Sequence, residues 1–157
     1  MSNHEPEWLT EREQRAWRNY LRATSQLATF VGQDLFAAFQ ITLAKYEVLV
    51  RLTEAEDGQM RMSELAGDLV SSRSRLTRTV SSMEDAGLVE REACTKDRRG
   101  RLCRITPKGR ALIERMAPVH VASVRRHLLD KIGHDKLMVL GDIMAELIDE
   151  DATIADL

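Results

Sequence analysis

Residues that interrupt helices are scarce in this sequence, which has 3 prolines and 8 glycines among 157 residues. Long stretches are therefore free to be helical. No run of about 18 apolar residues occurs, so no membrane-spanning helix is expected. The first residues lack the basic and apolar regions of a signal peptide, which predicts a cytoplasmic protein without a membrane partner. Two cysteines in that compartment are expected to be reduced.

Signatures of catalysis are also missing. The sequence has no glycine-rich phosphate loop, no histidine paired with a nucleophile in a recognisable motif, and no paired acidic site outside predicted surface helices. We therefore expect no enzyme, no catalytic residue and no cofactor. His120 and His127 lie about two turns apart on one predicted helix, whereas metal-binding pairs usually lie one turn apart, so no metal site is expected.

Charge is distributed unevenly along the chain. The net charge is -2, and the hydrophobic (43%) and charged (31%) fractions suit a globular helical protein. The segment from Ser71 to Arg110 nevertheless carries 11 Lys and Arg against 5 Asp and Glu, while the remainder carries 12 against 20. A basic segment within an acidic protein predicts a focused surface for nucleic acid.

The N-terminal part, from Glu7 to about Phe39, predicts one long helix or two consecutive ones. Thr10 followed by Glu13 fits a capping box, which would instead start the helix at Glu11. Gly32 and Asp34 could bend or break it. An apolar stripe recurs at helical spacing, and its members are Trp17, Tyr20, Leu21, Thr24, Leu27, Ala28, Val31 and Leu35. A 30-residue helix spans about 45 Å. Its surplus apolar face predicts a second copy of the chain as partner.

Further helices are predicted on both sides of the basic segment. One is capped by Thr42 and runs to about Ala55, and Gln59–Arg61 is expected to form a short strand. Thr106 and Pro107 predict the start of a helix that reaches about Lys131, with a kink at Pro118. The last helix is expected from about Asp135 to Glu150, with apolar positions at helical spacing.

The basic segment begins with two short helices separated by a tight turn. The first runs from about Met62 to Asp68 and the second from about Arg73 to Ala86, with Ser71 or Ser72 as its cap. Helical spacing places one apolar set on a buried face, namely Leu76, Val80 and Met83. Arginines and hydroxyl side chains fall on the opposite face, where a guanidinium fork can recognise guanine and hydroxyls can reach phosphates or bases.

A basic hairpin follows the second helix. Val89 and Arg91 begin one strand, and Cys103 and Ile105 alternate on the other. Four cations crowd the tip around Gly100, which favours an anionic partner such as the phosphates beside a narrow groove. Helix, turn, helix and hairpin in this order predict a winged helix-turn-helix. The predicted fold is therefore mainly α with a small β-wing.

These motifs resemble the MarR family of bacterial transcriptional regulators. The matching stretches are Met62–Ala66, the serine- and arginine-rich helix, Gly87 to Arg91, Asp97 to Gly100, and Cys103 to Arg110. They keep their mutual spacing over about 50 residues, and the flanking helical lengths fit. Cys103 departs from the pattern, because the family usually has a branched aliphatic residue there.

The resemblance implies a homodimer that binds a pseudo-palindromic double-stranded operator, usually as a repressor, and that a small-molecule effector could release. The expected division is a dimerisation helix at 7–39, a DNA-binding domain at 42–106 and C-terminal dimerisation helices at 107–150. The expected DNA contacts are Ser71, Ser72, Arg73, Ser74, Arg75, Thr77, Arg78, Lys96, Asp97, Arg98, Arg99 and Arg101.

Several alternatives remain open from the sequence. The arginine helix and the hairpin tip could be solvated surfaces, and a winged helix could serve protein contact without DNA affinity. Trp17 and Tyr20 could line an effector pocket, although aromatic residues are more often core. If the hairpin turn centres near Arg98 and Arg99, Cys94 and Cys103 lie opposite each other and could form a redox-responsive disulfide. A buried cysteine acting as a small hydrophobe is the commoner case.

Overall fold

The computed structural model describes residues 7–69, 72–93 and 101–148 of the chain. The first elements are α1 (Glu11–Phe39), α2 (Leu43–Glu54), η1 (Glu56–Gly58), β1 (Gln59–Arg61), α3 (Met62–Asp68) and α4 (Arg73–Asp85). They are followed by β2 (Val89–Ala93), β3 (Arg101–Ile105), α5 (Pro107–Val124), η2 (Arg125–Leu129), α6 (Asp130–Ile132) and α7 (His134–Ala145). This mainly helical structure with one small sheet confirms the predicted fold class.

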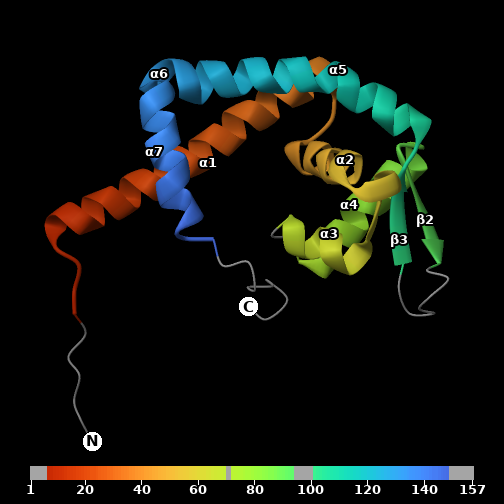
Figure 1. Ribbon diagram of the computed structural model, residues 1–157, viewed down its shortest axis with the longest axis horizontal. Coiled ribbons are helices and arrows are strands. Elements are labelled where there is room, and N and C mark those ends of the chain that lie inside the picture. The colour runs from red at the N-terminus through yellow and green to blue at the C-terminus, as the bar shows by residue number, and fades with distance from the viewer. Residues whose placement is uncertain (1–6, 70–71, 94–100, 149–157) are drawn as a thin grey trace, which may run out of the picture.

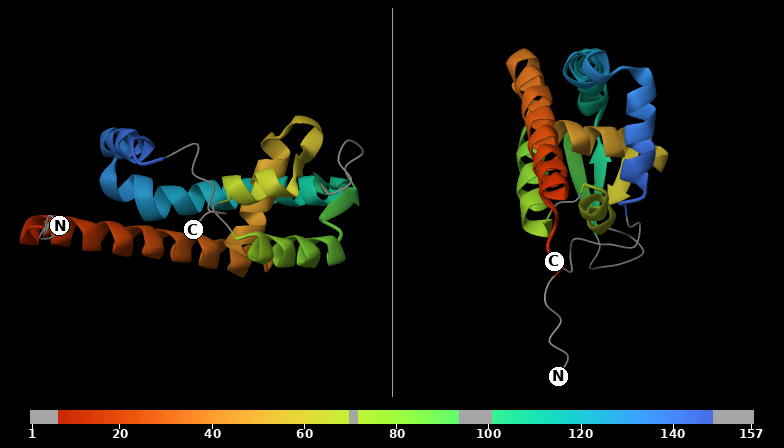
Figure 2. Two further views of the ribbon diagram at one scale, coloured as in Figure 1. Left: turned by 90° about the horizontal axis from the view of Figure 1, so that it is seen from below. Right: turned by 90° about the vertical axis from the view of Figure 1, so that its left-hand side faces the viewer.

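Two long helices support the rest of the molecule. α1 and α5 lie side by side, and the elements from α2 to β3 form a smaller body beneath one end of the pair (Figures 1 and 2). α6 and α7 lie at the other end of α5, away from that body. The small body and the long helices are thus two regions that share one continuous core.

α1 starts at Glu11 because a capping box forms there, as one of the two sequence alternatives predicted. The backbone N–H of Thr10 donates to Glu13 Oε2 at 2.7 Å, and the Glu13 N–H donates to Thr10 Oγ1 at 3.3 Å. The helix continues unbroken through Gly32 and Asp34 and ends at Gln40, which adopts φ 56°. Thr42 then caps α2 as expected, accepting from the Lys45 N–H.

The sheet has the strand order β1-β3-β2, with both pairings antiparallel. β1 is the strand predicted at Gln59–Arg61, and it pairs Met60 with Cys103. Along β3 the side chains of Cys103 and Ile105 are buried, whereas Leu102 and Arg104 are partly exposed. This confirms the predicted alternation. The sheet therefore turns one face toward the helices.

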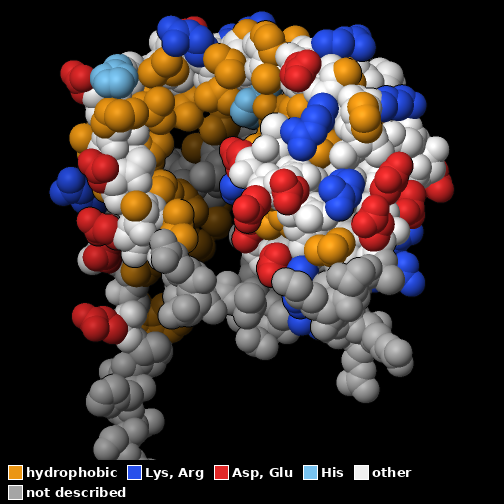
Figure 3. Space-filling view, turned by 45° about the vertical axis from the view of Figure 1, so that its right-hand side comes forward, with side chains coloured by type: hydrophobic (Ala, Val, Ile, Leu, Met, Phe, Trp, Pro, Cys, Tyr) orange, Lys and Arg blue, Asp and Glu red, His pale blue; other side chains and the backbone are white. Residues whose placement is uncertain are grey.

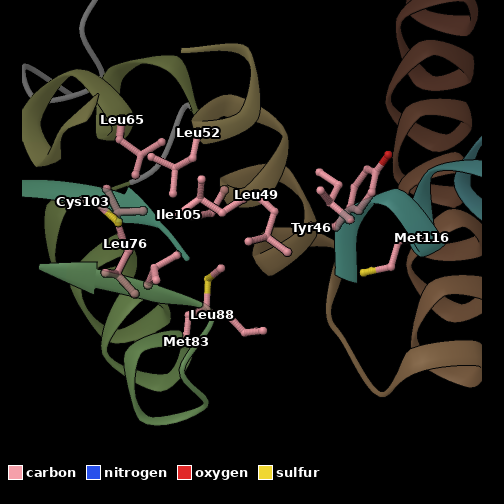
Figure 4. Close-up of a cluster of buried hydrophobic side chains, with 14 of the residues drawn as sticks. Tyr46, Leu49, Leu52, Leu65, Leu76, Met83, Leu88, Cys103, Ile105 and Met116 are labelled. Atoms are coloured by element: carbon pink, nitrogen blue, oxygen red, sulfur yellow. The ribbon is translucent and has the colours of Figure 1, made fainter. Parts of the chain in front are cut away.

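Buried hydrophobic side chains from α1, α2, α3, α4, β2, β3 and α5 join into one cluster (Figure 4). Leu35 comes from α1, Leu49 and Leu52 from α2, Leu65 from α3 and Met116 from α5, and each is completely or almost completely buried. The cluster also contains the three apolar positions predicted for the buried face of the second short helix, Leu76, Val80 and Met83. Burial of each such side chain stabilises the fold by about 1.5–3 kcal/mol.

α5 begins as predicted, with Thr106 accepting from the Gly109 N–H and Pro107 in the first turn. The helical run continues through Pro118 to Ile132, close to the predicted end at Lys131. The chain departs from α-helical hydrogen bonding at Arg125–Leu129, which forms a π-helical turn. The irregularity thus falls beyond the proline, and a kink at Pro118 itself stays a prediction.

Asp34 ties α1 to this irregular turn. Its Oδ2 accepts from Ser123 Oγ at 2.6 Å, and His127 Nε2 and Arg126 Nη1 approach the same oxygen at 3.1 Å and 3.4 Å. The His127 ring also stacks on Phe30 of α1, with centroids 4.9 Å apart. The hydrogen bond from Ser123, with smaller contributions from His127 and Arg126, lowers the pKa of Asp34 despite partial burial.

α7 is the helix predicted from about Asp135, and it begins at His134 after Gly133, where φ is 82°. Its helical residues end at Ala145, and the expected continuation to Glu150 lies partly outside the described residues. No residue of α7 is buried. Its apolar side chains are instead exposed, including Met138, Val139 and Ile143.

Among residues 7–69, 72–93 and 101–148, no single helix is long and apolar enough to cross a membrane. α1 and α2 pass such a length and composition test only as a joined pair, and they meet at a bend of 86°. Val48, Leu49 and Leu52 of α2 are completely buried in the core.

The Asp34 contacts predict a pH-dependent contribution to stability. Asp34→Ala removes a charged acceptor with three donors, so we expect the free energy of unfolding at pH 7 to fall by about 1–2 kcal/mol. Because the folded pKa is lowered from 3.8, this contribution is fully present above that value and disappears as pH falls through the lowered one. Urea denaturation of both proteins at one fixed concentration measures the difference. Asp130→Ala, on the exposed surface of α6, is the control and should cost little; equal losses would contradict the assignment.

Candidate nucleic-acid interface

α3 and α4 are the two helices of the predicted helix-turn-helix, and residues 70–71 between them lie outside the described residues. α3 contributes Leu65 and Ala66 to the core, and α4 contributes Leu76, Val80 and Met83. Because these positions recur every three to four residues, the intervening side chains of α4 must point away from the core. The residues predicted to contact DNA on this helix, and exposed in the structure, are Ser72, Arg73, Ser74, Arg75, Thr77 and Arg78.

The cap of α4 resolves a choice that the sequence left open. Ser72 precedes the helix in an extended conformation, and its Oγ accepts from the Arg75 N–H at 3.4 Å. Ser71 lies outside the described residues. In the first turn of the helix, Thr77 Oγ1 donates to the Arg73 carbonyl at 2.7 Å, which leaves its lone pairs available.

The three arginines of α4 keep their charge unneutralised. Within the described ranges, no carboxylate lies within salt-bridge distance of Arg73, Arg75 or Arg78. Other arginines in the chain do form such pairs, for example Arg51 with Glu54 and Arg91 with Glu84. A helix with three exposed guanidinium groups that have no carboxylate partner among the described residues is suited to phosphates and guanine edges.

The predicted wing is present as the β2–β3 hairpin beside α4 (Figure 1). Its strands end with Ala93 opposite Arg101, and Arg101 is exposed. The expected contacts Lys96, Asp97, Arg98 and Arg99 lie outside the described residues. The described structure therefore brings Arg101 and the α4 arginines onto one small domain, and the four tip residues stay a prediction.

The turn between α4 and the hairpin is held from α5. Gly87 adopts φ 69°, as expected for a glycine that ends a helix. Lys108 Nζ donates to the Ala86 carbonyl at 2.7 Å, and Thr106 Oγ1 lies 2.8 Å from the Gly87 carbonyl. Gly109 allows close approach, because a Cβ there would lie 2.3 Å from the Leu88 carbonyl oxygen. The start of α5 thus fixes where the hairpin begins.

Sequence reasoning missed a contact between α4 and the hairpin. Glu84, in the last turn of α4, accepts three hydrogen bonds from Arg91 of β2. The donors are the backbone N–H at 3.0 Å, Nε at 2.9 Å and Nη2 at 2.6 Å. The only signal in the sequence is opposite charges on either side of Gly87, which is too common to identify a pair.

The alternative in which Cys94 and Cys103 lie opposite each other is wrong. The strand register places Cys103 opposite Arg91 and not opposite Cys94, which itself lies outside the described residues. Cys103 is a free thiol that is completely buried. Burial raises its pKa to about 11, and Arg91 opposes this only in part. Desolvation is thus the larger effect on this thiol.

Trp17 and Tyr20 do not belong to the core of a single chain. Their rings stack with centroids 5.8 Å apart, and 52% of Trp17 and 38% of Tyr20 is exposed. They lie on the half of α1 that extends beyond the small body (Figure 1). Only another molecule could bury these two rings further.

A cavity of about 520 Å³ lies between α2, the end of α3 and α5. Tyr46 and His120 line it and stack on each other with centroids 4.6 Å apart. Burial lowers the pKa of His120 and raises that of Glu47, which also lines the cavity. His120 and His127 thus each stack on a different aromatic ring. Across the described ranges, no group of three metal-ligating side chains is found.

The helix-turn-helix with its antiparallel hairpin defines a winged-helix protein, a class that presents one helix to DNA. The model of the MarR family matches residues 41–100. AbsC, a MarR family transcriptional regulator from Streptomyces coelicolor, is 40% identical with a TM-score of 0.83, over 90% of this chain and 95% of that one. This chain therefore belongs to the MarR family of transcriptional regulators.

Two further solved structures from Streptomyces coelicolor extend the comparison. Sco3205, a MarR family regulator solved in complex with DNA, is 36% identical with a TM-score of 0.86, over 92% of this chain and 91% of that one. Sco5413, at 24% identity and a TM-score of 0.77, covers 88% of this chain and 94% of that one, and shows a shared fold.

The Cys103 environment predicts slow thiol chemistry. In a Cys94→Ser variant, which leaves Cys103 as the sole cysteine, we expect folded protein at pH 8 to react with iodoacetamide about 100-fold more slowly than urea-unfolded protein. The thiolate is the reacting species, and raising the pKa from 9.0 to about 11 reduces its fraction by about that factor. Mass spectrometry over time measures both rates. Similar rates in the two states would contradict the buried, neutral thiol.

Proposed function

We propose that this chain is a homodimeric transcriptional repressor that places α4 of each subunit in successive major grooves of a pseudo-palindromic operator. The observation that carries the proposal is the outer face of α4, where Arg73, Arg75 and Arg78 are exposed beside a buried apolar face. The DNA complex of the 36% identical Sco3205 supports the same use of this fold. Two-fold symmetry requires half-sites about one DNA turn, 10–10.5 bp, apart.

The hairpin is proposed to lie along the adjacent minor groove. Arg101 is exposed at the far end of the described strand pair, opposite Ala93, and Lys96, Arg98 and Arg99 lie between these two residues in the sequence. Arginines inserted into a narrow minor groove meet an enhanced negative potential. Asp97 is proposed to orient Arg99 by an ion pair. The DNA-contact set expected from the sequence is thus kept as the proposed interface.

Dimerisation is supported by the apolar surface that one chain leaves uncovered. Half or more of Trp8, Trp17, Val139 and Ile143 is exposed, and so is 69% of Leu147. In the space-filling view, hydrophobic side chains border a hollow between the small body and the rest of the molecule (Figure 3). Contiguous apolar surface of this kind marks an interaction site. A second copy of the chain, related by two-fold symmetry, is its proposed occupant.

The proposed division of labour follows the two regions of the fold. Residues 42–106 form the DNA-binding domain, whereas residues 7–39 and 107–150 form the dimerisation region. Asp34 and Ser123 join the two dimerisation segments within a subunit. The distance between the two reading helices is then set by these long helices rather than by the DNA-binding domains themselves.

A small-molecule effector is proposed to act at the cavity between α2, α3 and α5. The cavity borders both regions, so a ligand there would contact the DNA-binding domain through Tyr46 and the dimerisation helix through His120. Trp17 and Tyr20 are less suited to this role, because they lie on the outlying half of α1. A ligand that favours one spacing of the reading helices would change operator affinity.

Two other functions have weaker support. A winged helix used only for protein contact gives no reason for three unneutralised arginines on one helix face. A cysteine-based redox switch is opposed by the buried, neutral Cys103 and by the register that places it opposite Arg91. A DNA-binding regulator acting in the cytoplasm, without enzymatic activity, remains the proposal.

The proposed interface predicts different effects at base-reading and phosphate-contacting positions. Arg75→Ala should weaken operator binding and alter base preference at one position of each half-site, because a bidentate contact discriminates by about 1–3 kcal/mol. Arg98→Ala should weaken binding evenly across sequences and reduce the salt slope by about one unit. Gel-shift assays across salt concentrations measure both, starting with the DNA upstream of the protein's own gene.

Arg12→Ala, on the exposed N-terminal part of α1, is the matched control and should leave binding nearly unchanged. Unaltered affinity and base preference in Arg75→Ala would show that α4 is not the reading helix. Wild-type protein with no salt-sensitive preference for any duplex would contradict the proposed function as a whole.

A further inference from the structure

We propose that Glu84 and Arg91 form a positioning pair that fixes the wing relative to the reading helix, and thereby determines whether the base pairs flanking each half-site are recognised. The inference rests on the proposed DNA binding by α4 and the hairpin. It assigns a role to two residues that are not themselves expected to touch DNA.

Both oxygens of the Glu84 carboxylate accept hydrogen bonds from Arg91. Glu84 Oε2 accepts from both Nε and Nη2 of Arg91, and Oε1 accepts from the Arg91 backbone N–H. One residue of β2 thus provides all three donors. The guanidinium fork fixes the direction of the side chain, and the backbone N–H fixes the strand itself.

The pair is placed where it can control the wing. Glu84 lies in the last turn of α4, whereas Arg91 lies at the middle of β2, opposite the buried Cys103 of β3. The strand pair then continues to Ala93 and Arg101. A change in the angle between α4 and β2 at Arg91 therefore moves the far end of the strand pair, where Arg101 lies.

Other contacts hold the turn but not this angle. The Lys108 and Thr106 bonds end on the carbonyls of Ala86 and Gly87, before β2 begins. Met83 and Val89 are buried on either side of the turn and keep the domain folded. Among the described contacts, the Glu84–Arg91 pair is the polar link that joins the helix to the strand beyond the turn.

The exposure and the charges of the pair indicate that Glu84 and Arg91 bind each other within the domain. The Arg91 side chain is 20% exposed and that of Glu84 is 35% exposed. Hydrogen bonds from Arg91 lower the pKa of Glu84, and the nearby charge of Arg101 adds to this. Arg91 therefore uses its donors on Glu84, while Arg101, at the start of β3, keeps an exposed side chain that can reach DNA.

Two substitutions separate positioning from general stability. Glu84→Gln keeps the shape of the side chain and removes its charge. Arg91→Lys keeps the charge and removes the planar fork. The matched control is Glu90→Gln, which makes the same chemical change at the neighbouring exposed position of β2. Thermal unfolding of each protein confirms that it is folded before DNA binding is measured.

The readout is the ratio of affinities for two duplexes. One is the full operator, selected from random duplexes with wild-type protein, and the other is that operator with the flanking base pairs beyond the α4 contacts replaced by mixed sequence. Wild-type protein and Glu90→Gln should bind the full operator at least about 10-fold more tightly. In Glu84→Gln and Arg91→Lys the ratio should fall to about 3-fold or less, with affinity for the replaced duplex nearly unchanged.

Each result decides the inference. An unchanged ratio in both variants would overturn the positioning role while leaving the proposed function intact. An equal loss on both duplexes would also overturn it, because a general structural defect weakens binding to each. If wild-type protein selects no duplex, or makes no use of the flanks, the proposed DNA reading or its wing contact fails first, and the inference fails with it. If Glu84→Gln does not fold, Arg91→Lys alone decides.

Discussion

The structure depends on the burial of one side of α4. Leu76, Val80 and Met83 are at most 2% exposed, and they pack toward α2 and the sheet. Helical periodicity then turns Arg75 and Arg78 away from that side of the helix. The sheet obeys the same constraint, because Cys103 and Ile105 face inward and Arg104 between them does not. The charged face is therefore a geometric consequence of how the core is packed.

Features set by neighbouring residues could be predicted from the sequence. The caps at Thr10, Thr42, Ser72 and Thr106 each form within one helical turn. Thr42 and Thr106 were anticipated outright, Thr10 as one of two starts for α1, and Ser72 as one of two serines. The short strand at Gln59–Arg61 and the glycine at position 87 were also expected, because alternation and helix termination are local patterns. The arginine face of α4 was predictable for the same reason.

Features set by distant contacts could not be predicted. Ser123 reaches Asp34 across 89 positions of sequence, and a π-helical turn beside it has no local marker. The Glu84–Arg91 contact depends on the angle at which β2 leaves the turn. The pKa of Cys103 could not be derived from the sequence, because burial, which only the folded chain supplies, outweighs the arginine beside it. Trp17 and Tyr20 follow a core-like pattern, although their own chain does not cover them.

Gly133 and α7 have a consequence for how the molecule matures. Gly133 adopts φ 82°, and a Cβ at this position would meet nothing within 4 Å. α7, which follows it, buries no residue. The shared core, which runs from α1 to α5, can therefore form within one chain, whereas the proposed dimer would cover α7 only in a step that depends on concentration. A chain with a damaged α7 should accordingly aggregate during synthesis, even though its winged-helix domain is correctly folded.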